Sequence, residues 1–353
     1  MNKILSIVVP TYNMERYLTS AITSLFVSAP LFSLLDIIIV NDGSTDNSLS
    51  IAQDFARQHP DVIRVISKTN GNYGSCINSA LKVATGKYIK ILDADDSFST
   101  TALSAFINHL TTEKADLVLT NYCIINQRGK RIKSMHIPLK PSPHNELTHT
   151  QLAAVANIMS MHNVCYRTAI LQQIGYEQTE GISYTDMEWI FMPMSAVNSI
   201  KYYKLELYKY LLGRSEQTVD EQIHLRKMGD EEVSIMKNIA QLQSLHPSNA
   251  AYNYLTLRIF QRLRSVYHGT LAQPPTNTFN LKAFEDKLKS TGFDFEECTN
   301  NMSINCIFFN YHLIQNWRKT YNQIVLQQTI GYKIYHFIRS ARNAYNNFCY
   351  KYL

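Results

Sequence analysis

The chain has 353 residues, of which 45% are hydrophobic and 18% charged, a balance that predicts a globular protein with a sizeable core. No stretch approaches the roughly 20 apolar residues of a membrane-spanning helix, and the apolar run at residues 4–9 is too short for a signal peptide. The six cysteines are scattered without a CxxC pair, which argues against a zinc motif and predicts reduced thiols in a cytoplasmic protein.

The net positive charge comes from the end of the chain. No acidic residue follows Glu297, whereas six cations do, and these equal the whole formal net charge of +6. They are Arg318, Lys319, Lys333, Arg339, Arg342 and Lys351. The rest of the chain is therefore neutral, and the basic character belongs to the tail. A basic tail alone does not indicate nucleic-acid binding, because the sequence carries no recognised nucleic-acid motif.

Apolar strands and helices alternate over the first 92 residues. The predicted strands are residues 3–9, 35–40, 62–66 and 88–92. The predicted helices are residues 15–27, residues 49–56 and one that opens at 71–74 and is stopped by Gly86. This alternation predicts an α/β fold with a mostly parallel, Rossmann-like sheet flanked by helices. Because ligands bind outside the carboxyl ends of such strands, the polar clusters at 10–13, 41–48 and 93–96 should face one crevice.

The strand at 88–92 ends in three carboxylates within four residues, Asp93, Asp95 and Asp96. Carboxylates this close repel one another, and a hard divalent cation shared between them would relieve the repulsion. Such a cation, bound by these carboxylate oxygens, would in turn bridge phosphates. The alternative is a solvated turn whose aspartates cap the next helix.

Two other clusters are candidates for contacts with a bound nucleotide. Asp42, at a strand end, can accept a hydrogen bond from an imide N–H such as that of uracil, and the Tyr12 ring can cover a base or simply pack over the sheet edge. The segment from Asn70 to Gly74 places backbone N–H groups at a helix N-terminus, where anions bind. A plain loop explains those glycines equally well.

Five pieces of the first 100 residues, in this order and spacing, resemble the family 2 glycosyltransferases, which have the GT-A fold. They are Val8-Val-Pro-Thr-Tyr-Asn13, Val40-Asn-Asp-Gly-Ser-Thr-Asp46, Asn70-Gly-Asn-Tyr-Gly74 with Asn78, Thr85-Gly-Lys-Tyr, and Leu92-Asp-Ala-Asp-Asp96. The resemblance implies an inverting transferase that uses a nucleotide-sugar, usually a UDP-sugar, with Mg²⁺ or Mn²⁺ at the Asp-x-Asp. The donor nucleotide would be contacted by Pro10, Thr11, Tyr12, Asp42, Asn70 and Asp93, and the metal by Asp95 and Asp93. Ile77 departs from the family, in which many members have a basic residue before the asparagine.

Further along, a helix should begin near Thr185, with Asp186 and Glu188 in its first turn. Acidic residues there are explained by the helix dipole alone. Many members of the family carry a Glu-Asp pair at this place whose aspartate is the general base, which implies that role for Asp186. Here Thr185 replaces the preceding acid, and Glu188 is the rival base. By the same resemblance, Arg214 would face the donor phosphates; otherwise it is a surface charge.

Other segments complete the first domain, predicted as residues 1–220. A helix over 103–110, a strand over 116–121, a hairpin turn at 127–130 and a loop at 138–150 precede the Asp186 segment, and two strands fill 201–212. Residues 221–353 should form a mainly helical extension with apolar stripes in its core. One stripe is Val233, Met236, Ile239 and Ala240, and the next is Leu255, Ile259, Phe260, Leu263 and Val266.

The tail ends in a predicted basic amphipathic helix, residues 332–351. Such a helix can lie on an anionic membrane, which would place the protein peripherally at the inner face of the membrane. Docking on the catalytic domain is the alternative. Deletion of residues 311–353 is expected to abolish membrane binding without unfolding the protein.

The leading function is therefore metal-assisted inverting transfer of a sugar to a hydroxyl of a glycan or a lipid-linked glycan. A sugar-1-phosphate nucleotidyltransferase would need a Gly-rich loop with a lysine or arginine after the first strand, and Pro10-Thr-Tyr-Asn13 does not supply it. The third alternative is a nucleotide-sugar-binding module without activity. The intact Asp93, Asp95 and Asp186 argue against that module.

Overall fold

The fold was obtained as a computed structural model that falls into two compact units. The first unit is Met1–Leu212 with Asn249–Tyr254, and the second is Gly213–Ser248 with Leu255–Leu353. The described residues are 2–139, 146–214, 217, 221–271, 279–301, 304–306, 309–321, 323–328, 331–334, 336–337 and 340. The domain limits expected from the sequence, 1–220 and 221–353, stay a prediction.

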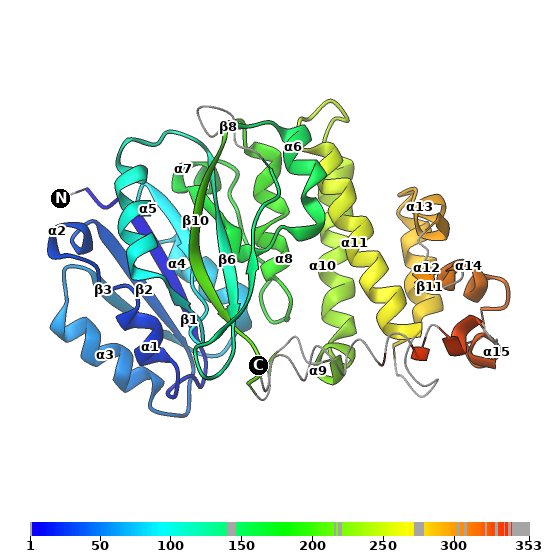
Figure 1. The fold of residues 1–353 in the computed structure, drawn as a ribbon, viewed down its shortest axis with the longest axis horizontal. Helices are drawn as coiled ribbons and strands as arrows, with labels where there is room; N and C mark the ends of the chain where they lie inside the picture. The colour runs from blue at the N-terminus through cyan, green and yellow to red at the C-terminus, as the bar shows by residue number, and fades with distance from the viewer. Residues whose placement is uncertain are drawn as a thin grey trace. The chain divides into compact units, whose positions relative to one another are not determined.

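A ten-stranded mixed sheet forms the first unit (Figure 1). Its main path runs β3 (Ile63–Lys68), β2 (Leu35–Asp42), β1 (Leu5–Thr11), β4 (Tyr88–Ile91), β9 (Val164–Arg167), β6 (Leu117–Ile125), β10 (Ile200–Leu211) and β5 (Ser97–Phe98). Two further strands, β7 (Arg131–Met135) and β8 (Glu146–Leu147), pair with β6 and β10. The first four strands of this path are parallel, as predicted, and β9 runs antiparallel between β4 and β6.

Register aligns the strand ends that carry the polar clusters. Val8 of β1 pairs with Ile38 of β2 on one side and with Ile91 of β4 on the other. Thr11 then pairs with Asn41, and Asp42 with Lys68 of β3. The segments after β1, β2 and β4 therefore begin at one edge of the sheet, which confirms the predicted convergence of the three clusters.

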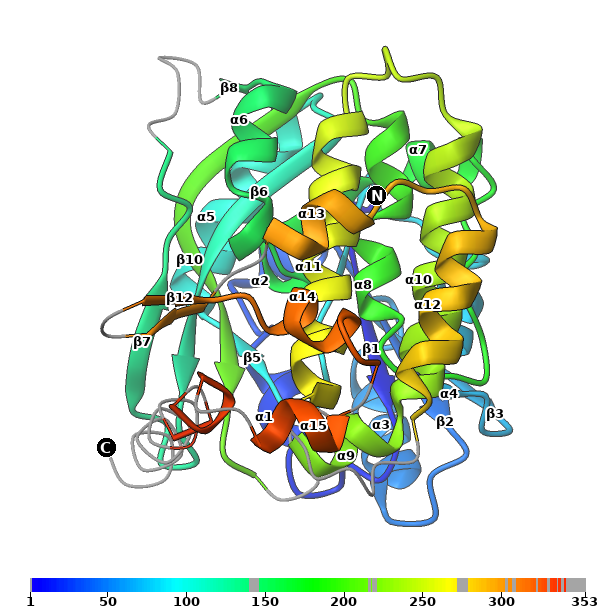
Figure 2. The same cartoon turned by 90° about the vertical axis from the view of Figure 1, so that its right-hand side faces the viewer.

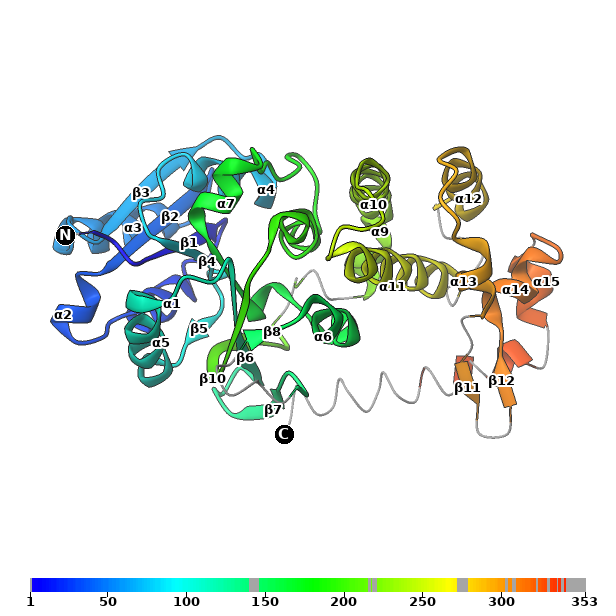
Figure 3. The same cartoon turned by 90° about the horizontal axis from the view of Figure 1, so that it is seen from above.

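Helices cover both faces of this sheet, as the alternation of strands and helices predicts. Figure 3 shows α4 and α7 over one face and α1, α2 and α5 over the other. The helices of this unit are α1 (Leu18–Thr23), α2 (Ala29–Phe32), α3 (Ser48–Gln58), α4 (Asn72–Leu81), α5 (Thr100–Thr112), α6 (His149–Ala154), α7 (Thr168–Gln173) and α8 (Asp186–Trp189). Short 3-10 turns are η1 (Ala156–Ile158), η2 (Met161–Asn163) and η3 (Met192–Ala196).

Close packing explains why the chain enters β4 through a glycine. A Cβ atom at Gly86 would lie 2.3 Å from the backbone nitrogen of Ser6 on β1. The neighbouring Thr85 donates from its backbone N–H and its hydroxyl to the buried Asp36 carboxylate, both at 2.9 Å. This junction fixes β4, and with it the aspartates that follow β4.

Two predicted segments are wrong: part of the predicted loop 138–150 belongs to β8 and to the start of α6, and residues 201–212 form the single strand β10 rather than two strands. No glycine or proline interrupts Ile200–Leu211, so no tight turn is available. Instead, the pairing with β6 shifts register between Tyr202 and Glu206 and again before Tyr208. Such a bulge re-aims the side chains that follow it, and Tyr208 becomes fully buried. The predicted hairpin is confirmed, because Asn126 and Lys130 close the turn between β6 and β7.

The second unit is mainly helical, as predicted. Figure 2 shows α10, α11 and α12 beside one another. The elements of this unit are α9 (Glu221–Arg226), α10 (Met228–Ser244), α11 (Tyr252–Leu271, whose first turn belongs to the first unit), α12 (Leu281–Ser290), α13 (Glu296–Asn301), β11 (Ile304–Cys306), β12 (Phe309–Tyr311), α14 (Leu313–Arg318) and α15 (Gln323–Gln328). None of the helices in the described part of the chain combines the length and apolarity needed to cross a bilayer.

The stripe predicted on α10 is only partly correct. Val233 is 49% exposed and Ala240 is also exposed, whereas Ile235, Ile239 and Leu242 are buried. The buried face of α10 therefore differs from the predicted stripe, and it includes a charged residue that an apolar pattern does not reveal. Glu231 accepts from Arg262 Nε of α11 at 3.0 Å, with both side chains buried. The stripe on α11 is confirmed except at Phe260, which is half-buried; Leu255, Ile259, Leu263 and Val266 are fully buried.

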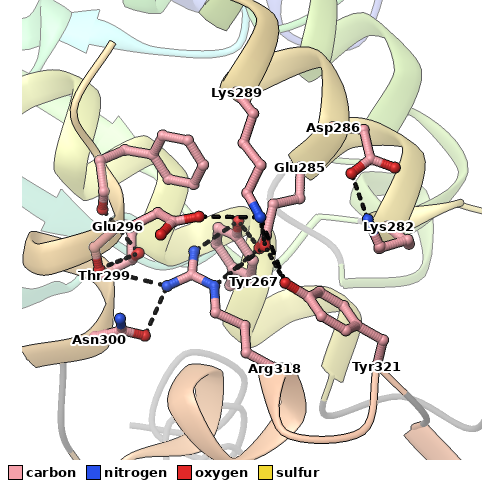
Figure 4. A network of polar contacts seen from close by, with 11 residues as sticks. Tyr267, Lys282, Glu285, Asp286, Lys289, Glu296, Thr299, Asn300, Arg318 and Tyr321 are labelled. Carbon is pink, nitrogen blue, oxygen red and sulfur yellow. Dashed lines mark hydrogen bonds and ion pairs between the residues drawn. The ribbon is translucent and has the colours of Figure 1, made fainter. Parts of the chain in front are cut away.

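A polar network fastens the start of the basic tail to this unit (Figure 4). Glu285 of α12 is fully buried and accepts from Arg318 Nε at 3.0 Å and from the Tyr267 hydroxyl at 2.6 Å. The same guanidinium donates from Nη1 to Asn300 Oδ1 at 2.7 Å. Leu313, Ile314 and Trp317 are buried as well. Arg318 is thus an internal ion-pair partner, and α14 packs its apolar side chains into the core of this unit.

We therefore expect Arg318→Met to destabilise the second unit by about 3–5 kcal/mol, the range for removing one partner of a buried ion pair. The matched control is Lys282→Met, which breaks the exposed pair with Asp286 in the same helix and should cost less than about 1 kcal/mol. Urea titration of both variants measures the difference. Equal midpoints for the two variants would show that the Arg318 pair contributes nothing.

Candidate functional site

The first cluster lies where β2 and β3 end. Asp42 is buried, and its Oδ1 accepts from Lys68 Nζ and, at 3.0 Å, from the Gly71 backbone N–H. The Asn70 side chain donates to the Asp42 carbonyl at 3.0 Å. The Gly71 N–H is therefore engaged by Asp42, so its predicted use as an anion donor is not supported by the geometry.

The loop after β1 borders this cluster. Thr11 is buried and donates from its hydroxyl to the Val9 carbonyl at 3.1 Å, and Pro10 is half-buried. Asn13, at a φ of 52°, accepts from the Thr45 backbone N–H at 2.8 Å. These contacts tie the loop after β1 to the loop after β2. Tyr12 is 48% exposed, so its ring is accessible to a ligand.

The second cluster is built around Asp93, which is half-buried at the end of β4. Its Oδ1 accepts from the Tyr73 hydroxyl of α4 at 2.9 Å, and its backbone N–H donates to the Tyr208 hydroxyl of β10 at 3.1 Å. Burial, and then the charges of Asp93 and Asp186, raise the pKa of the Tyr73 hydroxyl well above its ordinary value, so it stays a proton donor. Two tyrosines from distant elements thus hold the turn.

Asp96 anchors the same turn to β10. It is buried, and its Oδ2 accepts from the Tyr208 hydroxyl at 2.6 Å while its Oδ1 accepts from the Leu211 backbone N–H at 2.7 Å. Burial, and then the charges of Asp95 and Asp93, raise the pKa of the Asp96 carboxyl well above its usual range. The charges of Asp93 and Asp95 thus disfavour a negative charge on Asp96, which agrees with the repulsion predicted from the sequence.

His162 completes a group that suits a cation. One ligand atom from each of Asp93, Asp96 and His162 lies within 4.8 Å of the others. Burial, and then the Lys90 charge, lower the pKa of the His162 imidazole to about 3, so the ring is neutral at pH 7 and able to ligate. Carboxylate oxygens suit Mg²⁺ and Mn²⁺, and a neutral imidazole adds a nitrogen donor. The donor set fits a divalent cation.

Lys90, fully buried on β4, holds the turn that carries His162. Its Nζ donates to the His162 carbonyl at 2.7 Å and to the Val164 carbonyl at 3.1 Å. Burial lowers the pKa of this ammonium group to about 8. Lys90 therefore fixes η2 beside the strand that ends in the aspartates.

Asp186 is brought to the same place from α8. The carboxylate is half-buried, and its charge acts on the hydroxyls of Tyr73 and Tyr210. Asp93, which accepts from the Tyr73 hydroxyl, and Asp186 therefore both act on the same tyrosine. Glu188 is fully buried, and its Oε2 accepts from the Thr179 backbone N–H at 2.9 Å. The geometry favours Asp186 over Glu188 as the acid facing the site.

Two predicted residues remain. Asp95 is half-buried beside the other two acids, and its charge acts on Asp96 and Tyr210. Arg214 is half-buried and belongs to the second unit, directly after β10, so its predicted contact with the donor stays a prediction.

Sequence reasoning missed several residues of the site: Lys68, Tyr73, Lys90, His162, Tyr208 and Tyr210. Three of them lay close to predicted features: Lys68 follows the third predicted strand by two residues, Tyr73 lies inside the Asn70–Gly74 motif, and Lys90 lies within the predicted strand 88–92. His162 reaches the site on η2, directly before the antiparallel β9, and Tyr208 and Tyr210 reach it on the bulged β10, which no local pattern indicates.

Sequence comparison places this chain among known proteins. The family model described as "Glycosyl transferase family 2" matches residues 6–175. An uncharacterized glycosyltransferase of Mycoplasma pneumoniae is 34% identical over 128 residues, which cover 36% of this chain and 42% of that protein. The minor teichoic acid biosynthesis protein GgaB of Bacillus subtilis is 32% identical over 153 residues, covering 41% of this chain and 17% of that protein. The chain thus spans less than half the length of these two relatives.

Structure comparison agrees with this match. The crystal structure of S. aureus TarS 1–349 superposes with a TM-score of 0.62 at 21% identity, covering 82% of this chain and 79% of that one. A complex of the same TarS fragment with UDP-GlcNAc gives a TM-score of 0.53 at 21% identity, over 75% of this chain and 81% of that one. At 21% identity, the comparison shows that the two proteins share a fold.

Proposed function

We propose, from the premise that residues 6–175 form a family 2 glycosyltransferase domain of the GT-A fold, that this protein transfers a sugar from a UDP-sugar to a hydroxyl with inversion. The observation that carries the proposal is the convergence of the Asp42 cluster and the Asp93 turn at the edge where β1, β2 and β4 end, with the charge of Asp186 acting on the Tyr73 hydroxyl that donates to Asp93. One carboxylate is available to take a proton, and an acidic turn is available to hold a metal-bound diphosphate.

The donor side is supported by the first cluster. Asp42 and the exposed Tyr12 ring are suited to a uracil nucleoside, with Pro10, Thr11 and Asn70 forming the adjoining loops. The TarS fragment binds UDP-GlcNAc in its crystal structure, which supports a UDP-sugar for this chain. For the acceptor, the relative named for minor teichoic acid biosynthesis supports a glycan or lipid-linked glycan. Arg214 is proposed to face the donor phosphates.

In the proposed reaction, the Asp186 carboxylate accepts the proton of the acceptor hydroxyl as its oxygen bonds to the anomeric carbon and the bond to UDP breaks. We assign the cation to Asp93 and Asp95 as the family pattern implies, and His162, whose ligand atom groups with those of Asp93 and Asp96 rather than Asp95, would add a nitrogen donor. When bound, the cation supplies positive charge that stabilises the departing diphosphate. Tyr73 and Tyr208 keep Asp93 in place by donating to its carboxylate and accepting from its backbone N–H.

The test of the donor is a screen of nucleotide-sugars by thermal shift with Mn²⁺, because a ligand that binds the folded state raises its melting temperature by mass action. UDP-sugars should raise the melting temperature more than GDP- or ADP-sugars, and only with the metal. Slow release of UDP from the same donors separates a transferase from a module that merely binds. A shift without any UDP release would favour the binding module.

We also propose that the protein is cytoplasmic and that the end of its tail contacts the anionic inner face of the membrane. Of its described residues, Phe337 is 74% exposed, Ile334 is 36% exposed and Lys333 is exposed. Residues 335, 338–339 and 341–351 of the predicted helix lie outside the described residues. The tail combines cations and apolar side chains, as peripheral membrane helices do.

The deletion that tests membrane binding must begin later than residue 311, because α14 belongs to the packed core and the Tyr332 hydroxyl donates to the Leu271 carbonyl at 2.9 Å. Deletion of residues 336–353 should leave the melting temperature nearly unchanged and abolish sedimentation with anionic liposomes at low salt. Neutral liposomes are the control. Full-length protein that never sediments with anionic liposomes would contradict the proposal.

A further inference from the structure

A short segment before the proposed base, Gln178–Gly181, is held from two sides. On the first side, the Asn78 side chain of α4 makes the pair of hydrogen bonds to one backbone residue that a neighbouring β-strand would make. Asn78 Oδ1 accepts from the Gln178 backbone N–H at 2.8 Å, and Asn78 Nδ2 donates to the Gln178 carbonyl at 2.9 Å. The same nitrogen lies 2.9 Å from Glu180 Oε1, to which it also donates. A single amide side chain therefore satisfies the backbone of one residue and orients the next acid.

The first turn of α4 also approaches this segment so closely that a side chain is excluded. A Cβ atom at Gly74 would lie 2.0 Å from the Thr179 carbonyl oxygen. The Gly181 backbone N–H donates to the Gly71 carbonyl at 2.9 Å. Both glycines of the Asn70–Gly74 motif thus contact residues 179–181. This close contact alone explains why residue 74 is a glycine, so a phosphate-binding role is not needed to explain it.

From the second side, the segment is held by α8 itself. Glu188 is fully buried, and its Oε2 accepts from both the backbone N–H and the hydroxyl of Thr179, at 2.9 and 3.1 Å. The Glu188 backbone N–H donates to the Thr185 carbonyl at 2.9 Å and so closes the turn that contains Asp186. Because Asp186 and Glu188 share one short helix, fixing Glu188 fixes the backbone of Asp186.

From these contacts we infer that Asn78 and Glu188 are positioning residues, which hold the segment 178–185 so that the Asp186 carboxylate faces the Asp93 turn. The inference rests on the proposed function. Its consequence is specific, because Gly71, which caps α4, donates to Asp42, and Tyr73 in the first turn of α4 donates to Asp93. Helix α4 thereby sets the distance between the donor side of the site and the proposed base. Loosening the segment 178–185 should therefore lower turnover while donor binding is unchanged.

The variant that tests this is Asn78→Asp. It keeps an acceptor for the Gln178 N–H, removes the donor and places a carboxylate beside Glu180. We expect kcat to fall about 100-fold, the cost of misplacing a catalytic group by about 1 Å, with the affinity for UDP and Mn²⁺ nearly unchanged. Hydrogen exchange at the amides of residues 178–181 should become faster. Adding Glu180→Gln should restore much of kcat, because the new amide can donate to the carboxylate at position 78.

The control is Asn108→Asp, the same change at an exposed position of α5, which should alter neither kcat nor exchange. An active wild-type protein whose Asn78→Asp variant keeps its kcat, or loses UDP affinity by the same factor as kcat, overturns the positioning role alone. Failure of Glu180→Gln to restore any activity also counts against it. A wild-type protein that releases no UDP from any UDP-sugar overturns the proposed function, and this inference falls with it.

Discussion

Replacing Asp186 with asparagine should lower the rate of sugar transfer by about 10²–10⁴-fold, the usual contribution of a positioned general base. An acceptor hydroxyl is a poor nucleophile until its proton is taken in the transition state, and asparagine cannot take it. The affinity for UDP and Mn²⁺ should be nearly unchanged, because Asp42, Asp93 and Asp95 are untouched. Initial rates of UDP release with acceptor, and titration calorimetry of UDP with Mn²⁺, measure the two effects separately.

The control is Glu188→Gln, which keeps an oxygen acceptor for Thr179 in the buried position. This variant should retain the acidic limb of the pH profile of kcat, even where its rate falls, because the base is still present. Asp186→Asn should lose that limb. If Asp186→Asn keeps near-normal turnover and Glu188→Gln loses both turnover and the limb, the base is Glu188.

The second large effect is expected at the metal. Asp95→Asn keeps the size of the side chain and removes a negative charge from a turn whose three acids repel one another. Because altering even the groups that support a metal ligand costs about 10–100-fold in metal affinity, loss of Asp95 should weaken Mn²⁺-dependent UDP binding by at least that factor. Titration calorimetry of UDP with Mn²⁺ and with EDTA gives the two affinities.

Asp54→Asn is the matched control for this variant, since Asp54 is an exposed carboxylate on α3 that pairs with Arg57. It should leave UDP affinity unchanged in both conditions. UDP affinity in the wild-type protein that is the same with Mn²⁺ and with EDTA would mean that the aspartates of the turn have a structural role only.

Much of the first unit could be predicted because its central strands are buried on both faces. Such strands are continuous apolar runs, and β2 is buried along its whole length. The runs at 3–9, 35–40, 62–66 and 88–92 accordingly match β1, β2, β3 and β4 to within two residues. The error at β10 has a different origin. A bulge is defined by the register with the partner strand, and the sequence of one strand does not contain it.

The site shows the same division. Residues at the ends of parallel strands could be predicted to meet, because register brings Thr11, Asp42 and Asp93 to one edge of the sheet. His162 and Tyr208 could not, since they arrive from η2 and from the bulged strand more than 60 residues away in sequence. The role of Arg318 was hidden for a similar reason. A cation in a basic tail gives no sign that its partner, Glu285, is buried in another helix.

The most direct test of the proposed inverting transfer is a proton NMR time course of an α-linked UDP-sugar hydrolysed by the protein with Mn²⁺, with water as the acceptor. Inversion at the anomeric carbon predicts that UDP and the free sugar appear together and that the β anomer appears first, before mutarotation mixes the anomers. Asp186→Asn should slow the appearance of both products. An α anomer as the first product, or no UDP from any UDP-sugar, would contradict the account.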